Sequence, residues 1–228
     1  MRKLTRLQSL IAGTAFATAG VFGAPAAALA ADTHPASTTD QVVTSTVTNP
    51  APDTTTTPAA APAPAAPAPA DSELHPVPVT ADQQTSTLDH DQLANAKAIV
   101  DAGKDMNLPP RAWEIAVATS LQEANLHNLG DLGAKNDHDS LGLFQQRTGT
   151  GGWGTADQIM DPHHAATAFY QRLVKVPGWD SMALTQAAQK VQVSAYPQAY
   201  AKHEAQAGTA IDALYGTGPA ADQATDLR

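Results

Sequence analysis

The sequence lacks cysteine entirely and is poor in aromatic residues, which make up 5% of its 228 residues. Without cysteine the chain has no disulfide, no thiolate metal ligand and no cysteine nucleophile, so cysteine peptidases and transpeptidases are excluded. Basic residues are also scarce: 13 Lys and Arg stand against 22 Asp and Glu, for a net charge of −9. Such an acidic chain does not suit nucleic acid or anionic lipid as a partner.

Several common catalytic motifs are missing as well. There is no His-Glu-x-x-His and no Gly-x-Ser-x-Gly, so the sequence favours neither a zinc peptidase nor a serine hydrolase. His163 and His164 are neighbours in a predicted helix and point apart, so we predict no metal site. Segment 148–154 contains Gly-x-Gly-x-x-Gly, but no strand precedes it, which favours a flexible glycine-rich loop over a nucleotide site. We expect no cofactor.

The N-terminal residues 1–30 have the pattern of a secretory signal peptide. Three basic residues among the first six are followed by an apolar run over about 10–22 and by Ala28-Leu29-Ala30, a small-residue cleavage pattern. A retained membrane anchor is the alternative, but the run is short for a bilayer span and contains glycine. We therefore expect a protein that is secreted to the extracellular space or cell wall, without stable membrane insertion.

Residues 31–87 are rich in Ala, Pro and Thr, and Asn49–Ala70 reads NPAPDTTTTPAAAPAPAAPAPA. This composition buries too little apolar surface to offset chain entropy, so we predict a disordered linker. Alternating Ala-Pro favours extended, polyproline-like segments, which would make the linker a semi-rigid spacer. Whether it carries a domain through a wall or is a tether without further role stays open on composition alone.

Helical periodicity dominates residues 88–215, and no convincing strand pattern occurs there. We predict an all-α, or mainly α, domain, with a flexible tail over 216–228. The loop 126–140 leaves room for a small hairpin. The first two expected helices run from a cap at Asp89 or Asp91 to about Met106 and from Pro109-Pro110 to about Glu123, and a short helical turn is expected over 141–146. Three further helices are expected to begin at a Thr155/Gln158 capping box, at Asp161-Pro162 and at a cap formed by Thr185. The last expected helix runs from Pro197 to about Tyr215.

Glu123, near the end of the second helix, is the candidate general acid. Three, four and seven residues before it stand Ser120, Thr119 and Ala116, so its face of the helix carries small residues. We expect the carboxyl group to be half-buried there. Lost hydration would then raise its pKa toward the range useful for acid catalysis.

The order of the motifs after Glu123 resembles the lysozyme-like lytic transglycosylases, which are related to soluble lytic transglycosylases and goose-type lysozyme. In that family a helix ending in Glu-Ser is followed by a Gly-Leu-Met-Gln turn, a helix started by Asp/Asn-Pro and an Ala-Tyr segment. The similarity spans roughly Leu93 to Tyr200. The matching elements are Glu123, Gly142-Leu143-Phe144-Gln145 with Phe144 for Met, Asp161-Pro162 to Leu173, and Ser194-Ala195-Tyr196.

The resemblance implies a lysozyme-like fold and a secreted, monomeric enzyme that acts on peptidoglycan glycan strands. Glu123 would protonate the β-1,4 glycosidic oxygen between N-acetylmuramic acid and N-acetylglucosamine, then act as base while the muramoyl 6-hydroxyl closes a 1,6-anhydro ring. One carboxylate suffices, because the substrate supplies the nucleophile. The implied substrate-binding residues are Gln145 with the backbone of Gly142, Leu143 and Phe144, which would hold the acetamido sugar, and Tyr196, which would position Glu123.

Three alternatives stay open. Asp137 or Asp139 could activate water opposite Glu123, giving a hydrolytic lysozyme, although turn formation is the favoured role for these aspartates. A non-catalytic wall-binding module of the same fold is the second, because Ala124 stands where the family has Ser and Pro197 follows Tyr196. A secreted structural or signalling protein that does not touch glycan is the third.

Overall fold

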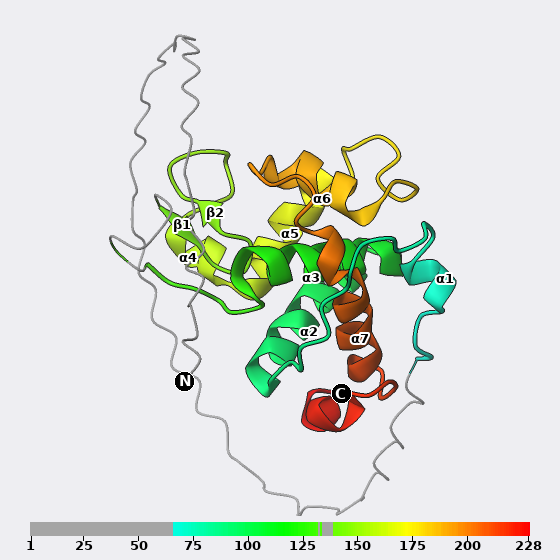
Figure 1. Ribbon diagram of the computed structural model, residues 1–228. Coiled ribbons are helices and arrows are strands. Elements are labelled where there is room, and N and C mark those ends of the chain that lie inside the picture. The colour runs from blue at the N-terminus through cyan, green and yellow to red at the C-terminus, as the bar shows by residue number, and fades with distance from the viewer. Residues whose placement is uncertain (1–65, 132, 134–138) are drawn as a thin grey trace, which may run out of the picture. The chain divides into compact units, whose positions relative to one another are not determined.

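The computed structural model describes residues 66–131, 133 and 139–228, which belong to one compact unit (Figure 1). The predicted signal peptide and most of the predicted linker lie outside this range. No helix in the described part of the chain is long and apolar enough to cross a membrane. The helices are α1 (Asp71–Leu74), α2 (His90–Asp105), α3 (Pro110–Ala124), α4 (Ala156–Met160), α5 (Pro162–Leu173), α6 (Leu184–Gln192) and α7 (Glu204–Leu214), with 3-10 helices η2 (Ala201–His203) and η3 (Ala221–Leu227). The predicted mainly α class is therefore confirmed.

Helix α3 is the centre of the fold, and it packs against α1, α2, α5, α6 and α7 (Figure 1). Every residue from Arg111 to Leu121 is buried. This is expected of a central helix that neighbouring helices surround on all sides. Pro110 lies in the first turn, where its missing N–H costs no hydrogen bond. Asn125 ends the helix in the left-handed conformation, and the amide of Leu126 donates back to the Ser120 carbonyl. This ending fixes Glu123 in the last turn.

The expected caps of the flanking helices are confirmed. The Asp89 carboxylate accepts from the backbone amide of Gln92 at the start of α2, and Asp161 accepts from that of His164 at the start of α5. Thr155 and Gln158 form the predicted capping box of α4. These caps fix where α2 and α5 begin, and the two helices pack against each other beside α3.

The segment 141–146 is not the short helical turn that the sequence predicts. It is a hairpin, in which β1 (Ser140–Leu141) pairs antiparallel with β2 (Gln146–Arg147), and residues 142–145 form the turn. Gly142 and Gln145 have φ values of 73° and 48°, in the left-handed region. A right-handed helix cannot continue through two such residues, so the chain reverses instead.

Packed structure also precedes Leu88, the predicted boundary between linker and domain, because α1 packs against α3. Leu74 of α1 is only 3% exposed, and its carbonyl accepts a hydrogen bond from Arg111. Residues 76–88, which we call the strap, connect α1 to α2 and bond to the region around η2. Composition does not predict that the strap is ordered. The strap has few apolar side chains, and hydrogen bonds to distant residues hold it in place.

The predicted tail over 216–228 also folds. Helix η3 packs on α2 and α7, Ala224 is fully buried, and the Arg228 guanidinium donates to the carbonyls of Ala213 and Ala221. Two helix starts differ from the expectation as well. Helix α6 begins at Leu184 with Ala183 as its cap, and the last helix begins at Glu204 after the 3-10 turn η2.

Candidate active site

Glu123 lies half-buried in the last turn of α3, as predicted. Burial raises the pKa of its carboxyl group above the usual range, and two hydrogen-bonding side chains, Tyr200 and Gln192, act in the opposite direction. The end of a helix also disfavours negative charge, because the last backbone carbonyls point there. The carboxyl group therefore keeps its proton to higher pH than an exposed glutamate, as a general acid requires.

Tyr200 is the residue that positions this carboxyl group. Its hydroxyl donates a hydrogen bond of 2.7 Å to Oε1 of Glu123, and its ring is fully buried. Burial and the Glu123 charge raise the pKa of the Tyr200 hydroxyl far above its usual range, so it stays a donor. The resemblance implied this role for Tyr196, but Tyr196 is 54% exposed and Tyr200 makes the contact.

Gln192, the last residue of α6, joins the acid to the hairpin turn. Its amide nitrogen donates to the carbonyl oxygen of Phe144 over 2.9 Å, and the same side chain lies near enough to Glu123 to favour the charged form of the carboxyl group. Glu123 and the 142–145 turn, which lie apart in sequence, are thus within reach of one side chain. Sequence reasoning missed Gln192, since a glutamine at a helix end carries no distinctive signal.

The hairpin turn is held rigidly from several sides. The Gly142 amide donates to the Leu129 carbonyl over 2.7 Å, and the Gly142 carbonyl accepts from the Gln145 side chain at 3.1 Å. A Cβ on Gly142 would lie 2.5 Å from the carbonyl oxygen of Ile159, so only glycine fits there. The turn predicted to bind the sugar is therefore preorganised by its backbone.

The other residues predicted to bind substrate divide into buried and accessible side chains. Leu143 and Phe144 are buried in the core, where the Phe144 ring stacks on Phe169 with centroids 5.0 Å apart. Their side chains hold the turn, so only their backbone groups could meet a ligand. Gln145 is half-buried, and Tyr196 is exposed, four residues beyond the end of α6.

Asp139 shapes the hairpin, which agrees with the turn-forming role favoured from the sequence. Its Oδ1 accepts from Arg147, and its Oδ2 accepts from the Thr148 hydroxyl and the Gly149 amide. These bonds hold the pKa of Asp139 far below its usual range. A carboxylate that accepts these hydrogen bonds is a weak base. Asp137 lies outside the described residues.

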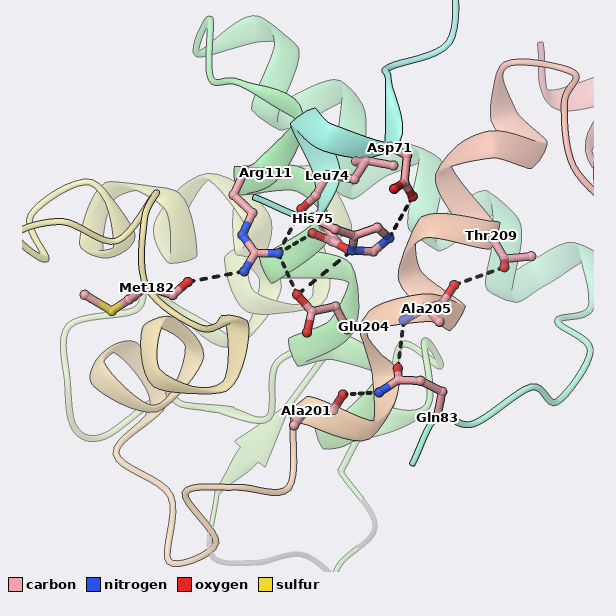
Figure 2. Close-up of polar contacts among 11 residues, drawn as sticks. Asp71, Leu74, His75, Gln83, Arg111, Met182, Ala201, Glu204, Ala205 and Thr209 are labelled. Carbon is pink, nitrogen blue, oxygen red and sulfur yellow. Dashed lines mark hydrogen bonds and ion pairs between the residues drawn. The ribbon is translucent and has the colours of Figure 1, made fainter. Parts of the chain in front are cut away.

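A second polar cluster joins the C-cap of α1 to α3 and α7 (Figure 2). His75, Glu114 and Glu204 each offer an atom within 4.8 Å of the others, a spacing that could suit a metal ion. However, Nη1 of Arg111 lies 2.6 Å from Glu114 and 2.7 Å from Glu204. The guanidinium already supplies the cation between the two carboxylates, so the cluster is an ion-pair network rather than a metal site.

Two described cavities lie away from Glu123. One, of about 230 Å³, lies between the strap and the start of α6, and the other, of about 290 Å³, adjoins His75 and Gly208. Their polar lining residues include Glu204 and His75, which belong to the ion-pair network. The second cavity is also lined by Asp71 and Asp212, whose carboxylates adjoin His75.

No protein-family model matches the sequence, and no curated protein matches it at a significant level.

Proposed function

We propose that this protein is a secreted peptidoglycan-cleaving enzyme with a lysozyme-like fold, which acts by lytic transglycosylation through Glu123. The observation that carries the proposal is the link from acid to turn. A half-buried carboxyl group with a raised pKa accepts from Tyr200 and lies near Gln192, whose side chain donates to the backbone of a rigid turn. This arrangement offers a proton donor beside a preorganised polar surface, as glycosidic bond cleavage needs.

The proposed reaction balances without water. Glu123 gives its proton to the glycosidic oxygen as the bond from that oxygen to C1 of the muramoyl residue breaks. The resulting carboxylate then takes the proton of the muramoyl 6-hydroxyl, whose oxygen bonds to C1 and forms the 1,6-anhydro ring. Tyr200 stabilises the carboxylate between these two steps, because a hydroxyl donor favours the charged form.

A single-carboxylate mechanism is favoured by the surroundings of Glu123. Two-carboxylate glycosidases place their acids roughly 5 to 9.5 Å apart, close enough to influence each other's titration. Among the described residues, the side chains that shift the pKa of Glu123 are Tyr200 and Gln192, and Asp139 is bound by Arg147. In lytic transglycosylation the nucleophile comes from the substrate, so no second carboxylate is required.

The test is digestion of purified peptidoglycan followed by mass spectrometry of the soluble fragments. The protein should release anhydro-muropeptides, and Glu123→Gln should release none while keeping its fold. Glu73→Gln is the matched control, because Glu73 is exposed and glutamine can replace glutamate in its capping box. Fragments heavier by one water would show hydrolysis instead. Binding to insoluble peptidoglycan without release would favour the non-catalytic module, and absence of binding would leave a protein that does not touch glycan.

A further inference from the structure

The junction between η2 and α7 is bridged by a side chain from the strap. Nε2 of Gln83 donates to the carbonyl oxygen of Ala201, and Oε1 of Gln83 accepts from the amide of Ala205, each over 2.9 Å (Figure 2). In an uninterrupted α-helix the amide of residue 205 would donate directly to the carbonyl of residue 201. The Gln83 amide group thus stands in for one helical hydrogen bond and interrupts the helix there.

This junction begins one residue after Tyr200. The amide of His203 donates to the Tyr200 carbonyl over 3.1 Å, so Tyr200 forms the first position of the 3-10 turn. The backbone amide of Gln84 adds a bond of 2.8 Å to the Lys202 carbonyl. The strap therefore holds the backbone on which the Tyr200 ring and its hydroxyl depend.

We propose that Gln83 is a positioning residue, which keeps η2 in its 3-10 form and thereby aims the Tyr200 hydroxyl at Glu123. Its meaning for catalysis rests on the proposed function, but its effect on Glu123 does not. Without the Gln83 amide, the Ala205 amide and Ala201 carbonyl are free to bond to each other. The 3-10 turn, with three residues per turn, would then rewind toward 3.6, which rotates Tyr200 about the helix axis.

The direct readout is the titration of Glu123 by NMR, using the full chain labelled with ¹³C at the glutamate carboxyl groups. The chain has only four glutamates, Glu73, Glu114, Glu123 and Glu204, so Glu123→Gln identifies the signal of interest. In Gln83→Ala we expect the pKa of Glu123 to rise, because the carboxylate loses the Tyr200 hydrogen bond that favours its charged form.

Two control variants separate positioning from general loosening of the strap. Gln84→Ala removes an exposed side chain while its backbone bond to Lys202 persists, so the Glu123 titration should not change. Gln206→Ala removes two hydrogen bonds to Ser86 and weakens the strap at a site beyond the junction. It should lower stability and leave the Glu123 titration in place.

A double-mutant cycle with Tyr200→Phe decides whether the effect passes through Tyr200. In the Tyr200→Phe background the hydroxyl is already gone, so Gln83→Ala should add no further change to the Glu123 titration. A shift of equal size in both backgrounds would overturn the proposal. So would a folded Gln83→Ala protein in which Glu123 titrates as in the unaltered protein.

Peptidoglycan cleavage supplies a second readout. Gln83→Ala should lower the cleavage rate by about tenfold to a hundredfold, the range expected when a catalytic group is displaced by about 1 Å. Gln84→Ala should keep the full rate. If the unaltered protein cleaves no glycan, the proposed function fails, while the NMR titrations still decide the role of Gln83.

Discussion

The side-chain amide of Gln192 donates a hydrogen bond of 2.9 Å to the main-chain carbonyl of Phe144. Because the same side chain also lies near Glu123 and favours its charged form, it connects the acid with the turn. Val193 follows in the left-handed conformation at φ 54°, which is strained for a β-branched residue. The chain accepts this strain at the end of α6, directly after the residue that joins acid and turn.

Replacing Gln192 with alanine should therefore impair cleavage more than it impairs stability. The pKa of Glu123 should rise, because one of the two side chains that favour the carboxylate is lost. The cleavage rate should fall on the order of tenfold, since the acid loses its link to the turn. Rates across pH, measured from the soluble fragments, check this.

Gln186→Ala is the matched control for Gln192→Ala. Gln186 lies on the same helix with an exposed side chain, and neither the turn nor Glu123 depends on it. A Gln192→Ala protein with unchanged rate and unchanged pH dependence would remove Gln192 from the site.

The sequence predicts the helices best where local signals act alone. Asp89, Thr155 and Asp161 cap their helices as expected, because a cap needs only a side chain and the backbone two or three residues ahead. The rise in the pKa of Glu123 was equally predictable from the small residues on its helix face.

Features that depend on distant contacts were not predictable. Tyr196 and Tyr200 lie four residues apart, and only the tertiary fold decides which of them reaches Glu123. The strap and η3 carry few apolar residues, so their order follows from contacts such as Gln83 to Ala201 and Arg228 to Ala213. The sequence predicts a helical turn where the structure has the hairpin turn. One of the two left-handed residues that reverse the chain is a glutamine, which does not signal this conformation as glycine does.

Gly142→Ala should destabilise the fold by about 2 to 4 kcal/mol, because alanine is strained in the left-handed conformation and its Cβ would be overpacked. The new Cβ would lie 2.5 Å from the Ile159 carbonyl at a φ of 73°. Urea unfolding measures the change. Gly130→Ala is the control, because its Cβ would meet nothing within 4 Å, and it should be near neutral. Equal stability of both variants would contradict the account of the turn.

Glu123→Gln should stabilise the folded protein at neutral pH, although it abolishes the proposed activity. Burial raises the pKa of Glu123 in the folded state, so the folded state binds more protons than the unfolded state. Stability from this group is therefore highest below the unfolded pKa and falls as pH rises through the folded pKa. Glutamine can still accept from Tyr200 without carrying charge.

Denaturant unfolding of the two proteins across pH checks this prediction. The advantage of Glu123→Gln should shrink as pH falls toward 4 and Glu123 becomes protonated in both states. A variant that is less stable than the unaltered protein at pH 7 would show that the charge of Glu123 is well accommodated.

Two histidines should give the stability of the fold opposite slopes with pH. Burial lowers the pKa of His203 to about 4, so its contribution is present above the unfolded value of 6.5 and is lost as pH falls toward 4. The ion-pair contact with Glu114, over 2.7 Å, raises the pKa of His75. That contribution is complete below 6.5 and is lost as pH rises through the folded pKa. The groups that face His75 are Asp71, Glu114, Glu204 and Asp212, with Arg111 on the far side of the carboxylates.

Substitution by glutamine separates the two contributions, because glutamine keeps a hydrogen-bonding group and does not titrate. His203→Gln should flatten the rise in unfolding free energy between about pH 4 and 6.5, the window between the folded and unfolded pKa values of His203. His75→Gln should flatten the fall above pH 6.5, where the unfolded histidine is already neutral. Since His75 ties α1 to α3, amide exchange in residues 71–75 should speed up with pH in the unaltered protein beyond the intrinsic rate. Exchange that follows the intrinsic rate alone would show that α1 stays docked without the charged histidine.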